Sequence, residues 1–296
     1  MIALSEWRKA AQFFDCAGHR IAYWTPPIAD AGKPWLLLIH GFPTSAWDWS
    51  ALWLSLEPHF NLAVLDMLGF GLSDKPADIQ YSILDQADLQ EALLEHLGVS
   101  EAHLFVHDYG DTVAQELLAR HHDKTLSFAI KSCVFLNGGL FPEQHRARPV
   151  QKLGLTPLGR LVGLMLTRDK LRKSFDAIFG ANTKASDEEI DGHWALINEN
   201  DGRRVFHKLL RYIPERKMMR SRWVGALTEA GVPLRLVNGG EDPVSGKHLY
   251  EYYLEQVPNA DAILLDDIGH YPQTEAPARI LAAFTDFHAK LGTIAL

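Results

Sequence analysis

Short apolar runs alternate with longer amphipathic stretches along most of this chain. Four runs have the length and apolar content of buried strands: Trp35–Ile39, Asn61–Leu65, Ala102–Val106 and Ser132–Leu136. Apolar residues between Ser82 and Leu97 instead recur about every 3.6 residues, the period of a helix. Because strands that alternate with helices are typical of βαβ units, the pattern predicts an α/β fold with a mostly parallel central sheet.

Further strand signals lie near both ends of the chain. Phe13–Cys16 and Ile21–Thr25 flank Gly18-His19 and predict a hairpin. Strand signals resume late in the chain at Leu234–Val237 and Ala262–Leu265. The sheet therefore draws its strands from two separate parts of the sequence.

The alternation stops between residues 138 and 223. This stretch shows several amphipathic helical segments with Pro and Gly breaks and no clear strand. We expect a core domain formed by residues 1–137 and 224–296, with residues 138–223 inserted as a helical cap.

Composition and charge describe an ordinary globular protein and narrow its partners. Hydrophobic residues make up 47% of the 296 residues and charged residues 22%, so disorder is not expected. The formal net charge of −8 argues against a nucleic-acid or anionic-membrane partner. The Lys and Arg residues form no long run, and Arg203-Arg204 and the cluster Arg211–Arg222 are interpreted as solvated helix faces.

The expected compartment is the cytoplasm. Cys16 and Cys133 are too few for a disulfide framework and are interpreted as reduced core residues. Met1–Gln12 lacks the apolar region of a signal peptide, and no run of 18 apolar residues occurs. The sequence leaves open whether the protein is a monomer or a homodimer.

The most informative segment joins the predicted strand ending at Val106 to a predicted helix, Thr112–His121. An apolar strand, a sharp turn and a helix form the nucleophile elbow of α/β-hydrolases, and here the nucleophile position holds Asp108. A carboxylate that attacks an ester gives a reactive anhydride, whereas attack on an sp³ carbon gives a stable alkyl ester that water later cleaves. The elbow therefore favours epoxides or alkyl halides over ordinary esters.

The segment His40–Pro43 follows a buried strand directly. A turn at this point would bring the backbone N–H of Phe42 beside the elbow, and the N–H of Tyr109 would be a second donor, so that the two form an oxyanion hole. The alternative is an ordinary turn in which Thr44 or Ser45 caps the next helix.

An acid and a histidine follow in the order that α/β-hydrolases use. Asn238–Pro243 comes just after a strand and carries the neighbouring acids Glu241 and Asp242. We favour Asp242 because a short carboxylate before a proline is held stiffly, although a simple Asx-type turn is the alternative. His270 lies in a loop after the last strand, at the edge of the sheet where such folds bind ligands.

Together these motifs resemble a known family. HGFP, the loop Asp66–Pro76, HDYGD, GGEDP and GHYPQ recur in the same order in α/β-hydrolases with an aspartate nucleophile, which include epoxide hydrolases and haloalkane dehalogenases. The segments His107–Leu118, Asn137–Glu143 and His270–Pro277 are similar to those of mesoderm-specific transcript-like hydrolases. The resemblance implies an α/β-hydrolase fold with an inserted helical cap.

The resemblance also implies a reaction in two steps. Asp108 would open the electrophile and form an alkyl ester, and His270, oriented by Asp242, would deprotonate the water that cleaves it. The N–H groups of Phe42 and Tyr109 would hold the oxyanion. The expected partners are a small apolar epoxide or alkyl halide and water, with no cofactor and no metal.

The two substrate classes differ in how the leaving group is stabilised. In the family, cap tyrosines protonate the epoxide oxygen, and Tyr212 is the one tyrosine of the predicted cap. His193 or His207 would be substitutes, and packing against the core is the alternative role for Tyr212. Epoxide hydrolysis is the first expectation.

Dehalogenation is the second expectation. Haloalkane dehalogenases typically use a Trp directly after the nucleophile together with an Asn or a second Trp, and this chain has Tyr109 and Phe42 at those places. Trp194 or Trp223 would have to compensate. A third possibility is a hydrolase scaffold that binds a small molecule or a partner without turnover.

Overall fold

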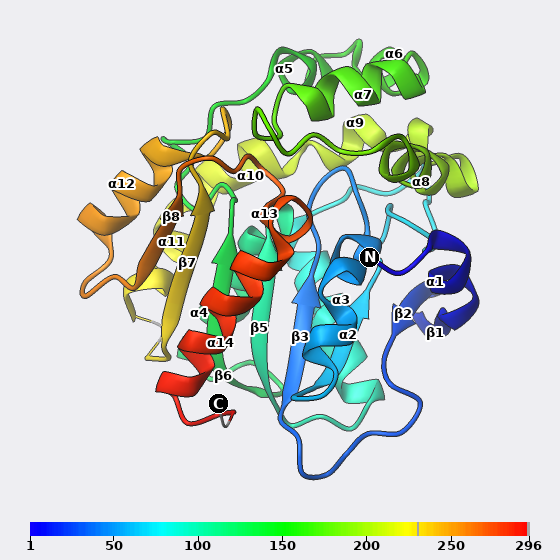
Figure 1. Cartoon of the computed structure of the whole chain (residues 1–296). Coiled ribbons are helices and arrows are strands. Elements are labelled where there is room, and N and C mark those ends of the chain that lie inside the picture. The colour runs from blue at the N-terminus through cyan, green and yellow to red at the C-terminus, as the bar shows by residue number, and fades with distance from the viewer. Residues whose placement is uncertain (230, 295–296) are drawn as a thin grey trace.

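A single mixed sheet forms the centre of the protein in the computed structural model, which describes residues 1–229 and 231–294 (Figure 1). The strand order is β1-β2-β4-β3-β5-β6-β7-β8. The β1–β2 and β2–β4 pairs are antiparallel and the other neighbours are parallel. The strands are β1 (Gln12–Cys16), β2 (His19–Trp24), β3 (Trp35–Ile39), β4 (Asn61–Leu65), β5 (Glu101–His107), β6 (Ala129–Leu136), β7 (Leu234–Gly239) and β8 (Ala262–Leu265).

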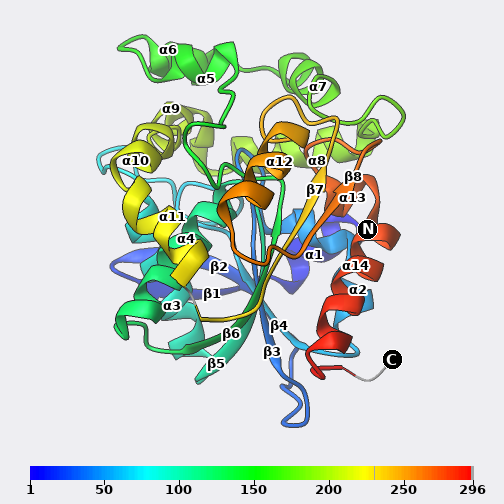
Figure 2. The ribbon, with the colours of Figure 1, turned by 90° about the vertical axis from the view of Figure 1, so that its left-hand side faces the viewer.

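Helices cover both faces of this sheet (Figure 2). In that view α3 and α4 lie on one face, and α2 and α14 lie on the other. The elements outside the predicted cap are α1 (Leu4–Ala10), the 3₁₀ helix η1 (Ala46–Ala51), α2 (Trp53–Leu56), α3 (Ile83–His96), α4 (Tyr109–Asp123), α12 (Lys247–Gln256), α13 (Pro272–Glu275) and α14 (Pro277–Lys290). The predicted mostly parallel sheet flanked by helices is confirmed.

The parallel strands are apolar on both faces because each face is covered by helices. Successive side chains of a strand point to opposite faces. In β3, Leu37 and Ile39 join the core on one side of the sheet, while Leu36 and Leu38 join the core on the other. A continuous apolar run such as 35–39 is therefore consistent with burial on both sides.

Between β6 and β7 the described chain forms helices. These are α5 (Pro149–Gly154), α6 (Gly159–Leu164), α7 (Arg168–Asp176), α8 (Asp187–Asn198), the 3₁₀ helix η2 (Glu199–Arg204), α9 (Phe206–Leu209), α10 (Tyr212–Met218) and α11 (Arg220–Glu229). Helices α5, α6 and α7 lie above the carboxyl ends of the strands (Figure 1). Helix α11 begins inside the predicted cap and packs against α4. The cap boundaries at 138 and 223 stay a prediction.

A buried lysine links the core to these helices. Lys75, in the loop after β4, donates from Nζ to the backbone carbonyl of Glu199, at 2.8 Å, and to that of Gly71. The carboxylate of Asp66 holds the start of the same loop by accepting from the N–H of Leu72 at 2.6 Å. These contacts give the loop a structural role. Among the described residues, no helix combines the length and the apolar character needed to cross a bilayer.

Candidate active site

The turn between β5 and α4 holds Asp108 in a conformation that side chains seldom adopt. Its φ is 51° and its ψ is −102°. Such backbone strain persists only where the surrounding structure enforces it. Tight packing enforces it here, because a Cβ atom at Gly110 would lie 2.5 Å from the backbone oxygen of Ile39. The predicted elbow therefore projects its carboxylate at the carboxyl edge of the sheet.

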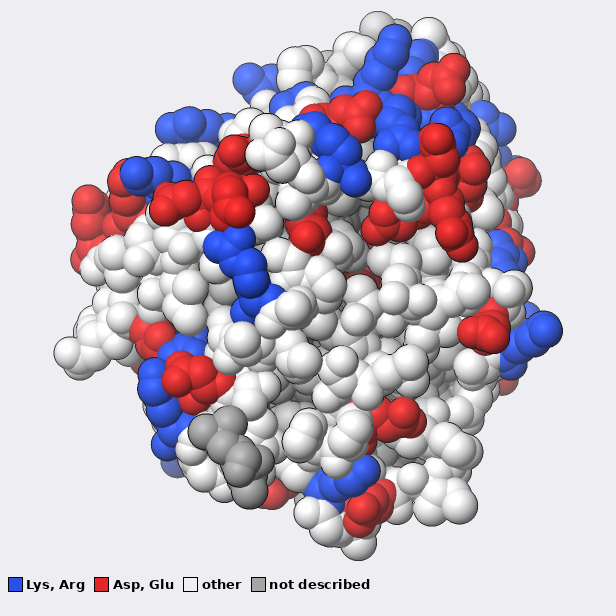
Figure 3. All heavy atoms as spheres, viewed as in Figure 1, with Lys and Arg blue, Asp and Glu red and all other residues white. Residues whose placement is uncertain are grey.

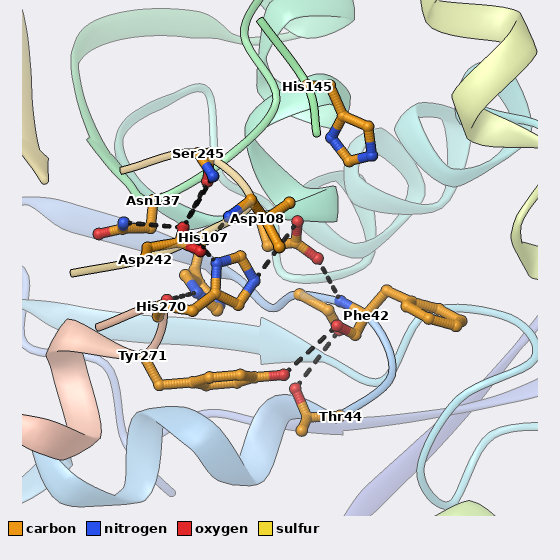
Figure 4. Close-up of polar contacts among 12 residues, drawn as sticks. Phe42, Thr44, His107, Asp108, Asn137, His145, Asp242, Ser245, His270 and Tyr271 are labelled. Atoms are coloured by element: carbon orange, nitrogen blue, oxygen red, sulfur yellow. Dashed lines mark hydrogen bonds and ion pairs between the residues drawn. The ribbon is translucent and has the colours of Figure 1, made fainter. Parts of the chain in front are cut away.

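The turn that follows β3 donates a hydrogen bond to the carboxylate of Asp108. The backbone N–H of Phe42 donates to Oδ2 of Asp108 at 2.9 Å. The hydroxyl of Tyr271 donates to the carbonyl of Phe42 at 3.3 Å and supports this turn (Figure 4). The N–H of Tyr109 opens α4, where the first amides of a helix lack partners within the helix. Its part in an oxyanion hole stays a prediction.

The histidine and the second acid lie beside this carboxylate, as Figure 4 shows. Nδ1 of His270 is 2.8 Å from Oδ2 of Asp242, and Nε2 is 3.8 Å from Oδ1 of Asp108. All three side chains are buried, with exposed fractions of 4%, 3% and 4% for Asp108, Asp242 and His270. The structure thus brings together three residues that are far apart in the sequence.

Hydrogen bonds saturate the carboxylate of Asp242. It accepts from the N–H of Val244 at 2.7 Å, from the hydroxyl of Ser245 at 2.7 Å and from the side-chain amide of Asn137 at 3.1 Å. Burial by itself would raise the pKa of Asp242, but the charge of His270 and these donors lower it well below its ordinary value. Glu241 instead accepts from the N–H of Ala181, so Asp242 is the acid in contact with the imidazole.

The two carboxylates set the protonation of the imidazole. Burial alone would lower the pKa of His270, but the charges of Asp242 and Asp108 raise it to about 9. At neutral pH the imidazole is therefore protonated in the free protein. Anything that neutralises Asp108 removes one of these charges and lowers the pKa of His270.

Two residues at this edge had not been expected in the site. Asn137 follows β6 directly, and its side-chain amide donates both to Asp242 and to the carbonyl of Gly239, the latter at 3.0 Å. His107 ends β5 and is hydrogen-bonded through Nε2 to the carbonyl of His270 at 2.8 Å. A polar residue placed directly after a buried strand was the available signal for Asn137.

Arg216 corrects the interpretation of the cluster 211–222 as a solvated face. Its side chain, from α10, is 2% exposed. It donates from Nε to the hydroxyl of Thr112 at 2.6 Å and from Nη2 to the backbone carbonyl of Asp108 at 3.2 Å. The guanidinium thus fixes the backbone of the elbow, while the carboxylate of Asp108 stays on the side of Phe42 and His270. The prediction was wrong because the pattern of charges along a helix does not show which one of several arginines is buried.

Tyr212 lies next to the site. Its ring packs on the ring of Tyr109 and beneath the guanidinium of Arg216, with 5.0 Å between the ring centroids and 4.5 Å from the ring centroid to the guanidinium carbon. Its hydroxyl accepts from the side-chain amide of Gln151 at 3.2 Å. Burial raises the pKa of Tyr212, and the charge of Asp108 raises it further, so the phenol remains protonated.

A cavity of about 360 Å³ opens onto Asp108 and His270. Its lining is largely apolar, and its remaining polar side chains are those of Arg148, Gln151, Lys173 and Ser174. Within the described part of the chain, no tyrosine or tryptophan is among the residues that line it. Tyr212 is thus not one of the lining residues, but its hydroxyl is hydrogen-bonded to Gln151, which is one of them.

The alternative donors named from the sequence also lie outside this lining. The indole N–H of Trp223 donates to Glu116 at 2.8 Å and is thereby engaged elsewhere. His193 packs between the rings of Trp47 and Phe175. In the described ranges, no group of three or more His, Cys, Asp or Glu side chains is arranged to hold a metal ion.

Comparisons with known proteins agree with this architecture. A profile of the alpha/beta hydrolase fold matches residues 34–277. The mesoderm-specific transcript homolog protein of Bos taurus is 42% identical over 296 residues, which cover 96% of this chain and 88% of that protein. The cis-3-alkyl-4-alkyloxetan-2-one decarboxylase of Shewanella oneidensis is 27% identical over 275 residues, which cover 89% and 84%.

A solved structure shows the same fold. The crystal structure of haloalkane dehalogenase DbeA from Bradyrhizobium elkani superposes with a TM-score of 0.79 at 21% identity, covering 96% of this chain and 99% of that one. The family match spans most of the chain and includes the elbow, the acid and the histidine. This chain therefore belongs to the α/β-hydrolase fold family.

Proposed function

We propose that this protein hydrolyses a small apolar electrophile through a covalent alkyl ester on Asp108. The observation that carries the proposal is the alignment of Asp108, His270 and Asp242. The imidazole of His270 is hydrogen-bonded to the carboxylate of Asp242, and its other nitrogen is 3.8 Å from the carboxylate of Asp108. A serine or cysteine at the elbow would favour acyl transfer. A carboxylate instead forms a stable ester, which water can later cleave, when it attacks an sp³ carbon.

In the first step the two oxygens of Asp108 have different roles. Oδ2 is held by the N–H of Phe42, so Oδ1 remains for attack on the substrate carbon. The new bond joins Oδ1 to carbon as the bond from carbon to the leaving group breaks. Alkylation converts the anionic carboxylate into a neutral ester.

This neutralisation prepares the second step. The charge of Asp108 is one of the causes that hold the pKa of His270 at about 9, so its loss lowers that pKa. The proton that the imidazolium then gives up is taken by the oxygen of the opened epoxide, or by solvent where the leaving group is an anion. Neutral His270 then takes a proton from water, and the hydroxide attacks the ester carbon. The N–H of Phe42 already contacts Oδ2, where the negative charge develops, and collapse releases the alcohol.

An epoxide is the substrate class that we favour. Its ring oxygen stays attached to the product and needs a proton or a donor as the ring opens. Gln151 lines the cavity and its amide donates to the hydroxyl of Tyr212, so this amide would donate a hydrogen bond to the epoxide oxygen as well. A halide leaving group would need indole N–H donors, and no tryptophan is among the described residues that line the cavity. Dehalogenation is therefore the second choice.

A strained cyclic ester is a second candidate, favoured by the cations of the cavity. Attack on its sp³ ring carbon releases a carboxylate, which needs a cation and no proton. Arg148 and Lys173 line the same cavity as Asp108. The Shewanella relative is named as acting on such a ring, an oxetan-2-one.

Trapping of the ester tests the proposal. With epoxide, haloalkane and oxetan-2-one panels, His270→Gln should accumulate a protein whose mass is raised by that of the bound substrate, because the water step is blocked. Asp108→Ala should show no adduct and lose turnover by at least about 10⁴-fold. Glu241→Gln, which changes the neighbouring acid that does not contact the imidazole, is the matched control and should retain turnover.

The pattern of adducts also separates the candidates. An adduct with epoxides alone supports the first candidate, and one with oxetan-2-ones alone supports the second. Full turnover by Asp108→Ala on a confirmed substrate would disprove the covalent step. Binding without turnover by the unaltered protein on every panel would identify a non-catalytic scaffold.

A further inference from the structure

The cap carries an exposed apolar surface, which we call the leucine-rich face. Its members are large apolar side chains of α5, α6 and the links beside them: Val150, Leu153, Leu155, Leu158, Leu161, Leu164 and Met165. They are seven of the 15 exposed large hydrophobic side chains in the described part of the chain. Single exposed leucines are ordinary, but several on two short helices that are in contact with each other indicate a surface that binds something apolar.

The packing of α6 fixes this face outward. The buried side of the helix carries glycines, and a Cβ at Gly163 would lie 2.2 Å from the backbone oxygen of Arg203. Glycine therefore lets the helix approach the body of the protein closely. Leu158 and Leu161 remain 58% and 53% exposed. The leucines thus lie outside because no room for a side chain exists on the other side.

The charge around this face differs from that of the whole chain. Residues 144–168 contain five cations, Arg146, Arg148, Lys152, Arg160 and Arg168, and no Asp or Glu, whereas the complete chain has a formal net charge of −8. Of these cations, only Arg168 forms an ion pair within residues 1–229 and 231–294. In Figure 3, Lys and Arg side chains lie along the upper edge, where Figure 1 places α5, α6 and α7, with Asp and Glu side chains between them.

A second cavity adds to this positive surface. It has a volume of about 820 Å³, and its lining includes Arg146, Lys152, Lys217 and Arg220. Glu143 is its one acidic residue and pairs with Arg220 at 2.5 Å. The hollow therefore keeps an excess of cations that suits a phosphate group. Because Arg146 and Lys152 also belong to the cationic segment 144–168, the hollow adjoins the leucine-rich face.

The same face reaches the mouth of the active-site cavity. Val150 belongs to the leucine-rich face and also lines the cavity above Asp108. Arg148 and Gln151, its neighbours in α5 and at the start of that helix, line the cavity too. An apolar molecule on this face would therefore meet the opening to the site directly.

We propose that the leucine-rich face docks on the surface of a bilayer that contains anionic lipids. Leucine side chains would enter the boundary between headgroups and acyl chains, and the flanking cations would contact lipid phosphates. A lipophilic substrate would then pass from the bilayer into the cavity beside Val150. Docking itself is independent of the proposed function, whereas this route for the substrate rests on it.

This inference departs from the expectation drawn from the total charge. Salt screens exposed charges beyond about 10 Å, so a membrane at this face is governed by the nearest residues and not by the sum over the chain. A second copy of the chain fits less well. In a twofold dimer through this face, the unpaired cations of one copy would approach those of the other.

Flotation of the full chain with vesicles tests the proposal. The vesicles are phosphatidylcholine alone or phosphatidylcholine mixed with phosphatidylglycerol. Binding should require the anionic lipid and should weaken as salt is raised. The double change Leu158→Ser with Leu161→Ser should reduce binding at least about tenfold. Arg146→Gln and Arg160→Gln should each reduce it about fivefold.

Leu54→Ser is the matched control, because Leu54 is 68% exposed on α2, away from the cap. It should bind as the unaltered protein does, and thermal unfolding should be unchanged in all of these variants. Absence of binding to both kinds of vesicle, or equal binding by the leucine double variant, would overturn the proposal.

Light scattering detects the competing outcome. A dimer that the leucine double variant converts to monomer, without vesicle binding by the unaltered protein, would assign the face to a second copy and overturn the proposal. Asp108→Ala should float as the unaltered protein does. Vesicle binding together with lack of turnover on every panel would therefore reject the proposed function and leave the docking surface standing.

Discussion

Two neighbouring regions of this molecule place side chains against the usual distribution, in opposite ways. At the carboxyl edge of the sheet, charged groups are buried, and at the top of the cap, leucines are exposed. A buried charge is tolerated only when other groups compensate it, as Asn137 and Ser245 do for Asp242. The leucine-rich face has no such partner in the described structure.

The two regions meet different physical requirements. The floor of the site is a closed network, so a change in one member is transmitted to the others through hydrogen bonds. The cap surface is open, so a change there alters binding without altering the fold. Activity should therefore depend steeply on the floor, and location of the protein should depend on the cap.

Asn137→Ala should give the largest effect outside the three residues of the proposed reaction. The change removes one donor to Asp242 and the bond to Gly239, and the imidazole loses its fixed orientation. Because a small misplacement strongly slows a positioned reaction, we expect kcat to fall about 100-fold while KM changes little. Steady-state kinetics across pH, with Asn137→Gln as the variant that keeps an amide donor, distinguish lost positioning from lost folding.

An unchanged kcat in Asn137→Ala would show that the network holds Asp242 without this amide. It would also weaken the contrast between a tightly coupled floor and an open cap.

Gln151→Leu and Tyr212→Phe test which side chain between the two regions assists ring opening. If the amide of Gln151 holds the opening ring, Gln151→Leu should slow epoxide turnover about tenfold. Tyr212→Phe should slow it less, because the phenol would act on the ring only through its hydrogen bond with that amide. Trapping with His270→Gln in each background measures the first step alone. A loss in Tyr212→Phe that exceeds the loss in Gln151→Leu would return the acid role to the tyrosine.

The pH dependence of unfolding should show the smallest but broadest effect. Burial lowers the pKa of His40 to about 4 and those of His107 and His193 to about 3. Their unfolded forms protonate near pH 6.5, so the free energy of unfolding should fall as pH drops below that value. Each group contributes about 1.4 kcal/mol per pH unit at most.

His270 acts in the opposite direction. Its pKa is raised to about 9 in the folded state, so its stabilising contribution is complete below pH 6.5 and is lost as pH rises through 9. Thermal unfolding should therefore be most resistant near pH 6.5. His193→Phe should reduce the fall in melting temperature below pH 6.5. His59→Gln, a change at an exposed histidine, should leave that fall as it is. These pKa shifts place the expected fall between pH 4 and 6.5. A melting temperature that stays constant over that range would show that burial does not keep these histidines neutral.

Much of the site was visible in the sequence because its parts are local patterns. The strand, turn and helix around Asp108 are consecutive, and the acid and the histidine each follow a strand directly. In a parallel sheet, the carboxyl ends of strands lie at one edge, so the order of the motifs was enough to expect them together. The structure places Asp108, Asp242 and His270 accordingly.

The sequence by itself determined the sheet, the elbow and the order of the three residues, since each depends on neighbours along the chain. Tertiary structure alone decided that Arg216 is buried on the carbonyl of Asp108, 108 residues away, and that Asn137 reaches Asp242 across 105 residues. It also decided that Gln151, which lines the cavity, is hydrogen-bonded to Tyr212, 61 residues away. Such contacts depend on how helices of the cap pack over the sheet, and a periodic pattern specifies which side of a helix is buried but not what that side meets.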